Sequence, residues 1–584
     1  MISVSNKTLR LGRAFAAIAL AIVIGASAPI SAFGQDTREG IVARTPQQKS
    51  DTEQSTSEKT QDQTQQNPIT QPLALSPEVS DERVGVDQNN KQLLTLQDVI
   101  ALALQNNLDI EQFRQSVQIA QYNLFSLYGF YDVTSGTEIG FRNSITPTAN
   151  IFGGADNSGA FSNKSLFYNF STSQQIQRTG GNYLIEFDNS RTVTSSTAST
   201  LTPQYSNTLS FSFTQPLMRN FSIDANRRAI QVGKKSLDLS DSQFRQTVIN
   251  IINSVQRAYW DMVFAIDAEK IARDNVRLAR QQLENNQKMV EAGTLAPIEL
   301  RSTEAQLEQN KGNVIVALQG ITTAENVLKG LVLKDPNDKM WNAVLIPADK
   351  PDLTQVIFNL QEASALALKN RPELDQLRLQ SEQKDIDIKY YKNQLKPQLN
   401  FVGSYRNDGL AGTPGIGREV NPQFIGGYGQ SLKNLFGQDF RTYQVGVSIS
   451  FPWRNRAAEA NYGRTLAEAK QLDARQRQMV QDVQIEVRNA LQAVEAARMR
   501  FEAARAGVIA ADAQFKGEQE RFRAGLSQNF LVLQRQTDFA VARSNELRAL
   551  TDYKKAIADL QRVTGMTLVS NNVQVQALPE KDTK

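Results

Sequence analysis

The sequence of 584 residues contains no cysteine and no histidine. Without cysteine, disulfides, zinc–thiolate sites and thiol catalysis are excluded. Without histidine, the commonest general base and the commonest metal ligand are missing. The sequence also shows no glycine-rich phosphate loop, no cluster of metal ligands and no nucleophile motif. We therefore expect a protein that is not an enzyme, with no catalytic residue, no metal site and no cofactor.

The chain also lacks a large excess of charge of one sign, since it has 64 basic and 60 acidic residues and a net charge of +4. The basic residues form no cluster or stripe of the kind that nucleic-acid-binding surfaces carry. We therefore expect no nucleic acid among the partners.

Long hydrophobic runs are scarce, and the clearest one lies near the N-terminus, from Ala14 to Ile24. Basic residues precede it, and the small-residue stretch that ends at Gly34 follows it. A membrane-spanning helix needs about 20 apolar residues, so the pattern favours a cleaved signal peptide over residues 1–34 rather than a membrane anchor. No later run reads as a spanning helix, so entry of the exported chain into a membrane would require a β-barrel.

Residues 35–92 are rich in glutamine, threonine, serine, aspartate and proline and contain few apolar residues. Such a composition cannot bury a hydrophobic core. We expect this segment to be a disordered linker.

Two similar strings indicate that the chain is internally duplicated. Residues 96–104 and 360–368 share six identical positions at an offset of 360 − 96 = 264. A second pair of markers, Gly293 and Gly525, has an offset of 525 − 293 = 232, so the first half carries about 264 − 232 = 32 extra residues. Self-similarity of this kind indicates a repeated structural unit. We predict a first repeat over 93–332, a connector over 333–358, a second repeat over 359–566 and a polar C-terminal tail over 567–584.

Each half contains a segment whose alternating residues predict β-strands. In the second half, 398–402 and 443–451 read as strands around a glycine-rich loop over 407–437. The first half, within 131–217, adds a hairpin near 166–192, because Thr179-Gly180-Gly181-Asn182 is a hairpin signal. The aromatic residues of this hairpin could form the interfacial girdle of a barrel or the core of an extracellular hairpin, and the sequence leaves both open: Phe167, Tyr168, Phe170 and Phe187.

A long helical pattern follows each β-segment. Apolar or small residues recur at alternating steps of four and three, which is the seam of a coiled coil. From about Asp224 to Val290 there is no proline, and these residues at 1.5 Å each would make a rod of roughly 100 Å. The rods stop at Gly293 and Gly525, as expected of glycine just past a helix end, and antiparallel helices return over about 297–332 and 530–563. The seam residues are Val248, Ile252, Val255, Tyr259, Met262 and Ile266 in the first half, and Val483, Val487, Ala490, Val494, Ala497, Phe501, Ala504, Val508, Ala511 and Phe515 in the second.

Over about residues 94–566, the chain resembles the TolC family of outer-membrane efflux proteins. The resemblance rests on the string at 94–107 with its copy at 360–371, on Pro397-Gln398-Leu399, on Val447-Ser448-Ile449-Ser450-Phe451-Pro452 followed by Arg454-Asn455-Arg456, and on the Ala-Gly tip turns.

This resemblance implies an α+β fold in which each chain gives four strands to an outer-membrane β-barrel that trimerisation closes. The barrel would be continuous with a long antiparallel α-helical barrel in the periplasm. The implied partners are two further copies of the chain, outer-membrane lipid, a periplasmic adaptor (membrane fusion) protein and an inner-membrane pump. The implied function is a channel-tunnel for efflux of small toxic compounds or for type I protein secretion.

The tip turns are the first candidates for the periplasmic aperture and for adaptor docking. In the family, acidic residues commonly lie six positions after the tip glycine, and this position is Glu299 in the first half but Leu531 in the second. Glu299 could form a gating ring or could be an acid of the first helical turn, stabilised by the helix dipole. Arg521 and Arg523 could pair with acids across the closed end or be solvated. The full set of candidates is Glu291, Ala292, Gly293, Glu299, Arg521, Arg523, Ala524 and Gly525.

Two other classes of protein share some of these features. A periplasmic adaptor also carries coiled-coil hairpins, but adaptors usually have one hairpin set, so the duplication argues against this class. An enzyme on a helical scaffold would need the catalytic motifs that the sequence lacks. The exported cargo cannot be read from the sequence.

Overall fold

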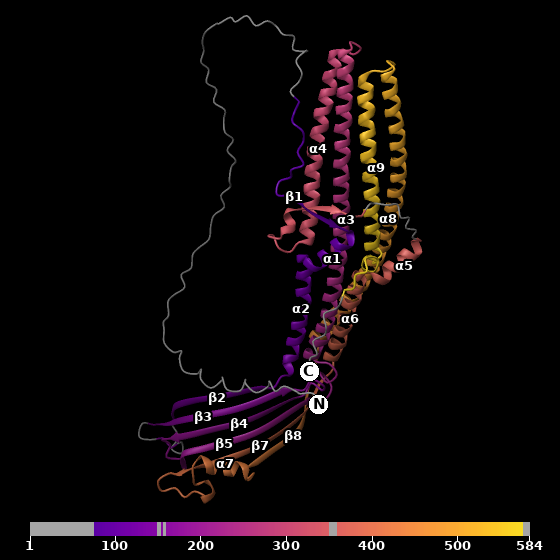
Figure 1. Ribbon diagram of the computed structural model, residues 1–584. Coiled ribbons are helices and arrows are strands. Elements are labelled where there is room, and N and C mark those ends of the chain that lie inside the picture. Colours follow the sequence, from indigo (N-terminus) through magenta and orange to yellow (C-terminus); the bar gives the residue numbers. More distant parts are fainter. Residues whose placement is uncertain (1–74, 149–153, 156–158, 350–358, 576–584) are drawn as a thin grey trace, which may run out of the picture. The chain divides into compact units, whose positions relative to one another are not determined.

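The computed structural model describes residues 75–148, 154–155, 159–349 and 359–575 (Figure 1). The predicted signal peptide, residues 35–74 of the predicted linker and residues 576–584 of the predicted tail lie outside the described residues.

Two antiparallel helical hairpins dominate the described chain (Figure 1). The first consists of α3 (Ala225–Glu291) and α4 (Pro297–Val332), and the second of α8 (Arg456–Arg523) and α9 (Asn529–Val563). The two hairpins lie side by side, because α3 contacts α9. The long helices and their returns therefore confirm the prediction from the coiled-coil seam. None of the described helices carries an apolar stretch of the length needed to cross a membrane.

Shorter helices begin at the two similar strings of the sequence. In the first half, α1 (Leu96–Asn106) starts with a capping box, in which the side chains of Thr95 and Asp98 bond each other's backbone N–H groups. Such a cap satisfies N–H groups that a helix end leaves unpaired. The corresponding α5 (Leu360–Asn370) starts at Asn359, whose side chain accepts from the Gln361 N–H. The helices α2 (Leu108–Tyr128) and α6 (Pro372–Gln394) follow and pack against α3 and, for α6, also against α8.

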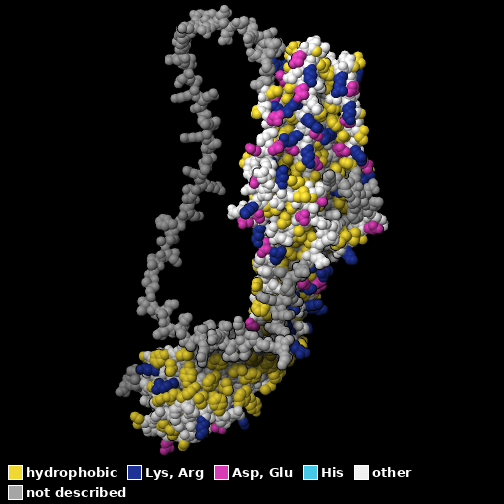
Figure 2. Space-filling view, viewed as in Figure 1, with side chains coloured by type: hydrophobic (Ala, Val, Ile, Leu, Met, Phe, Trp, Pro, Cys, Tyr) yellow, Lys and Arg dark blue, Asp and Glu magenta, His cyan; other side chains and the backbone are white. Residues whose placement is uncertain are grey.

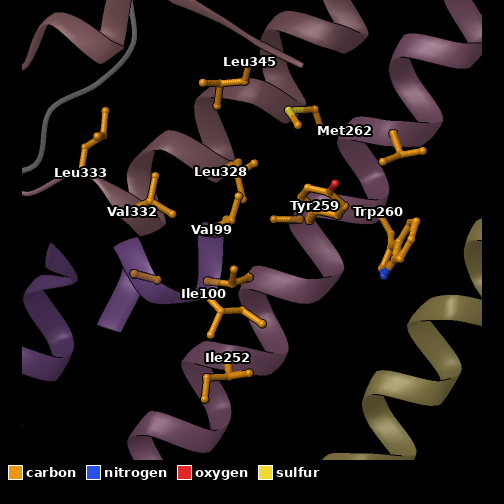
Figure 3. Packing of buried hydrophobic residues seen from close by; sticks show 14 of the residues in the cluster. Val99, Ile100, Ile252, Tyr259, Trp260, Met262, Leu328, Val332, Leu333 and Leu345 are labelled. Atoms are coloured by element: carbon orange, nitrogen blue, oxygen red, sulfur yellow. The ribbon is translucent and has the colours of Figure 1, made fainter. Parts of the chain in front are cut away.

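The largest core cluster lies where α1, α3 and α4 meet (Figure 3). The predicted seam residues Ile252, Tyr259 and Met262 are all buried there. They pack against apolar side chains of α1 and α4, such as Val99 and Leu328. The Tyr259 hydroxyl donates a 2.9 Å hydrogen bond to the Asp349 carboxylate, so its one polar group is satisfied. Tyr259, a predicted seam residue, and its neighbour Trp260 are therefore packing residues.

A small parallel sheet corrects two predicted boundaries. It pairs β1 (Asp87–Leu94) with β6 (Ala343–Pro347), so the predicted linker is wrong for its last residues, 87–92, and the connector contains a strand. Strand pairing supplies backbone hydrogen bonds where the sequence offers few apolar side chains.

The prediction of a polar C-terminal tail is likewise wrong over residues 567–575. Its first residues form α10 (Thr567–Ser570), and Leu568, Val573 and Val575 pack against the largest core cluster.

The main sheet has six strands in the order β2-β3-β4-β5-β7-β8, and every neighbouring pair is antiparallel. The prediction of four strands per chain is therefore wrong. The predicted hairpin is present as β3–β4, but it lies inside the sheet between β2 and β5. The strands are β2 (Thr134–Pro147), β3 (Ala160–Gln175), β4 (Asn182–Thr194), β5 (Leu201–Pro216), β7 (Gln398–Pro414) and β8 (Arg441–Ser450).

The predicted glycine-rich loop over 407–437 contains regular structure. Strand β7 continues to Pro414, and a nine-residue helix, α7 (Tyr428–Phe436), packs on β7 and β5. Gly409 permits this packing, since a Cβ atom there would lie 2.2 Å from the carbonyl oxygen of Ser431.

Candidate functional site

The two faces of the six-stranded sheet differ in chemistry, because side chains alternate along each strand. Following the pairing register across the sheet, one face carries aromatic and branched aliphatic residues, and these are exposed to an unusual degree. Ile139 on β2 is 73% exposed and Val445 on β8 is 71% exposed. Figure 2 shows hydrophobic side chains gathered over the strands. Other exposed members of this apolar face are Ile185, Phe211, Tyr443 and Val447.

The opposite face of the sheet is rich in hydroxyl side chains. Ser165 on β3 lies opposite Thr192 on β4, and their hydroxyl groups are hydrogen-bonded at 2.6 Å. The same face carries Ser210, Ser212, Ser404 and Ser448 on the later strands. A continuous exposed apolar surface marks contact with a membrane or another protein, whereas a hydroxyl-lined surface is compatible with water.

The apolar face is tall enough for a membrane. On β8 and the residue that follows the strand, it runs from Tyr443 to Phe451, which is eight steps, or about 27 Å along the chain at about 3.4 Å per residue. After a strand tilt of about 40°, this corresponds to about 20 Å of height, close to the apolar band of membrane barrels. At the end of this face next to α8, the rings of Phe451 and Trp453 lie 5.8 Å apart and are exposed, as in an aromatic girdle.

Helix α7 covers a polar interruption of the apolar face. Asn189, Asn207 and Asn407 lie on this face on three adjacent strands and are all buried. The amide of Asn207 donates to Asn189 at 2.6 Å, and the Tyr428 hydroxyl of α7 bonds the same Asn189 oxygen at 3.1 Å. The Asn407 amide donates to the backbone carbonyl of Leu435 in α7. The helix thus shields side chains that lipid could not satisfy.

Both edges of the sheet are unpaired within the described residues, because β2 and β8 each have a single neighbouring strand. An open edge exposes a row of N–H and C=O groups that can pair with another chain.

The tips of the two hairpins are tight turns at Gly293 and Gly525, with φ of +70° and +72°. This region of φ is strained for a residue with a Cβ atom. The N–H of the residue after each glycine bonds back five residues, at 2.9 Å from Thr294 to Met289 and at 2.8 Å from Leu526 to Arg521. These bonds end each long helix in a Schellman motif. The prediction that glycine ends the rods is confirmed.

A pocket of about 670 Å³ opens between the two tips, lined by Gln282, Lys288, Met289, Phe522, Arg523 and Gly525, among others. Of the predicted tip residues, Arg523, Ala524 and Gly525 line it. The other exposed candidates, Glu291, Ala292, Gly293 and Arg521, lie in or beside the two turns. The two arginines pair locally, Arg523 with Glu520 at 2.7 Å and Arg521 with Glu518 at 3.8 Å, all within α8.

A buried polar cluster below the tips joins the two hairpins. Asn529 of α9 is 1% exposed and accepts a 2.9 Å hydrogen bond from the Asn286 amide of α3. Its own amide donates to the Thr303 hydroxyl of α4 at 3.1 Å. Glu299 lies at the border of the cluster, where one carboxylate oxygen is 3.4 Å from the Asn529 amide. Glu299 is among the residues predicted from the sequence, whereas Asn529, Asn286 and Thr303 are not.

Among the described residues, no group of three or more aspartate or glutamate side chains could hold a metal ion.

The chain matches the model of the family described as "Outer membrane efflux protein" over residues 176–332 and 363–566. It is 21% identical over 375 residues to the outer membrane protein TolC of Vibrio cholerae, a match that covers 61% of this chain and 78% of that relative.

Solved structures share the fold. The open state of the MtrE outer membrane channel of Neisseria gonorrhoeae has a TM-score of 0.56 and 16% identity, covering 87% of this chain and 98% of that one. The CmeC outer membrane channel of Campylobacter jejuni has a TM-score of 0.56 and 15% identity, covering 84% of this chain and 89% of that one. Since the family model covers more than half of its residues, the chain belongs to the outer membrane efflux protein family.

Proposed function

We propose that three copies of the chain close their sheets into one barrel in the outer membrane, above a tunnel built by their helices. The observation that carries the proposal is the sheet itself, which has one exposed apolar face, one hydroxyl-rich face and two open edges. In a closed barrel the apolar face contacts lipid and the hydroxyl-rich face lines a water-filled lumen. In lipid, the backbone N–H and C=O groups of an open strand edge would have no hydrogen-bond partner, so both edges of the sheet must pair with other strands.

The direction of the strands supports this closure. Because the six strands alternate in direction, β2 and β8 run antiparallel to each other. The β8 edge of one copy can therefore pair with the β2 edge of the next in the antiparallel pattern, and the ring closes with an even number of strands. Three is the number of copies that the resemblance to the family implies.

The helices would continue the barrel as a periplasmic tunnel. The two hairpins of one chain are nearly equal in length, with α3 and α8 at 67 and 68 residues and α4 and α9 at 36 and 35. We propose that they descend from one duplicated unit, so that six similar hairpins surround the tunnel axis. Only the first half carries the β3–β4 hairpin, so the barrel has threefold symmetry.

The partners would dock at the tips. An adaptor protein would contact the tip turns and the pocket between them, and would link the tunnel to an inner-membrane pump. The tip candidates are the residues named above: Glu291, Ala292, Gly293, Glu299, Arg521, Arg523, Ala524 and Gly525. The cargo would pass from the pump to the cell exterior, so the protein acts as a conduit and not as an enzyme. The family match favours this function over a periplasmic adaptor.

The test is the location and the oligomeric state of the native protein. We expect it in outer-membrane fractions, as a trimer band that converts to a monomer band on heating in detergent. Recovery as a monomer in the soluble periplasmic fraction would contradict the proposal and favour the adaptor class.

A further inference from the structure

We infer that the β3–β4 hairpin is part of the membrane wall, so that the assembled barrel has eighteen strands and is as wide as the helical tunnel beneath it. This inference rests on the proposed closure of three sheets. The resemblance to the family implies four strands per chain, and thus twelve in a trimer, so the inference concerns a feature in which this chain departs from that pattern.

The strand pairing places the hairpin inside the wall. Strand β2 pairs with β3 over the whole length of β2, from Thr134 opposite Ser173 to Pro147 opposite Ala160. Strand β4 pairs with β5 from Asn182 opposite Thr214 to Thr192 opposite Gln204. A hairpin that projected from the barrel would leave β2 and β5 to pair with each other, but both strands are already paired to the hairpin.

The residue pattern of the hairpin matches that of its neighbours. Ile185 and Phe187 of β4 and Phe170 of β3 lie on the apolar face, with Phe170 directly opposite Phe187. Ile185 is 36% exposed in the single chain. On the other face, Ser165 and Thr192 continue the row of hydroxyl groups. A strand with one lipid face and one water face needs this alternation, whereas an extracellular hairpin does not.

The circumference of the wall supports the larger strand number. Each chain passes between helices and sheet four times, at the ends of α2 and α6 and the starts of α3 and α8. Three chains give twelve helices, and spacings of about 8–10 Å make a helical wall of about 100–120 Å. Strands about 4.8 Å apart and tilted by about 40° each take about 6.3 Å, so eighteen strands make about 113 Å and twelve only about 75 Å. At these spacings, eighteen strands match the circumference of the helical wall more closely than twelve.

The consequence concerns the cargo. A barrel wall of about 113 Å has a diameter of about 36 Å between strand backbones, against about 24 Å for twelve strands. With a lumen lined by serine and threonine hydroxyls, the outer opening admits bulky polar cargo up to the width of the tunnel itself.

The first test is to image the full-length trimer in lipid nanodiscs by electron microscopy and to count its strands. We expect eighteen strands and a wall about 1.5 times as wide as that of a twelve-stranded relative. A trimer with a twelve-stranded wall and three detached hairpins would overturn the inference while leaving the proposed function intact. If no trimer forms, the proposed function fails and the inference fails with it.

The second test uses a matched pair of neighbouring residues in β4. We expect Ile185→Lys, on the lipid face, to reduce the heat-modifiable trimer in outer-membrane fractions at least fivefold. Leu184→Lys, on the lumen face, should leave at least half of it. Equal trimer yields from the two variants would overturn the inference, because a hairpin outside the membrane has no lipid face.

Discussion

The side-chain amide of Asn286 in α3 donates a 2.9 Å hydrogen bond to the side-chain oxygen of Asn529 in α9. Asn286 is fully buried, and Asn529 also bonds Thr303 of α4, so three helices of two hairpins meet at one side chain. In a low-dielectric interior such a network is strong when complete and costly when broken. It therefore fixes the position of the second hairpin against the first, close to the tip turns.

Replacing Asn529 by alanine should loosen the tips. The change removes an acceptor that the amides of Asn286 and Gln282 share, and each hydrogen bond lost in this way costs about 0.5–1.5 kcal/mol. We expect a lower melting temperature and a higher single-channel conductance in lipid bilayers, since the tip is the closed end that the family resemblance implies. Asn545→Ala, on an exposed position of α9, is the matched control. Equal conductance of the two variants would show that Asn529 has no part in closure.

Glu299 gives a separate prediction on charge. Its carboxylate lies 3.4 Å from the Asn529 amide, at the border of the buried cluster. If three copies bring this carboxylate around one aperture, Glu299→Gln keeps the shape and removes three negative charges from the ring. We expect a loss of cation preference in reversal-potential measurements, with Glu299→Ala also raising the conductance. If Glu299→Gln leaves the cation selectivity unchanged, Glu299 has no role in the aperture. It is then an acid of the first helical turn, which the helix dipole stabilises.

The helical part of the fold was predictable from the sequence, because its signals are local. The apolar seam recurs every three or four residues, and no proline interrupts α3. A glycine marks the end of each long helix. Each of these signals lies in or next to the helix that it predicts. Asn529 was not predictable in this way. An asparagine four residues after a tip glycine reads as a solvated polar residue, and only the packing of α9 on α3 and α4 buries it.

The sheet was predicted less well, for physical reasons. The edge strand β2 has few large apolar residues, and Gly136 and Gly140 interrupt their alternation. Its pairing with β3 is what defines it as a strand. Helix α7 is short and glycine-flanked, so no helical period is visible, and it exists because it packs on Gly409 and the buried asparagines. Both features depend on tertiary contacts that a single sequence does not display.

The two faces of β8 allow a direct test of which side meets lipid. Val447 lies on the apolar face and is 59% exposed, and Ser448 beside it lies on the hydroxyl-rich face. A lysine facing the middle of the membrane costs about 2–4 kcal/mol in a barrel, whereas a lysine facing the lumen stays hydrated. We expect Val447→Lys to abolish most of the heat-modifiable trimer and Ser448→Lys to retain it. The reverse result would mean that the hydroxyl-rich face contacts lipid and that the apolar face lines the lumen.

A pH dependence is expected at the start of α6, outside the sheet. Arg371 is 6% exposed and bonds Glu373 at 3.0 Å and Glu486 of α8 at 2.6 Å. Burial alone would raise the pKa of Glu373, but the hydrogen bonds and charge of Arg371 outweigh it and hold this pKa below its ordinary value of 4.5. Because the pKa is lower in the folded state, the pair stabilises the fold above pH 4.5, and this stabilisation is lost as the pH falls through the lowered pKa.

Glu373→Gln should therefore lower the stability of the purified protein by about 1.5–3 kcal/mol at pH 7, the range for a hydrogen bond to a charged group. The gap in melting temperature between wild type and variant should narrow as the buffer is taken below pH 4.5, because the wild-type carboxyl then becomes protonated as well. Glu284→Gln, on an exposed position of α3, controls for the loss of one negative charge. A gap that stays constant from pH 7 to pH 3 would mean that packing of the Glu373 side chain, and not its charge, supports the junction of α6 with α8.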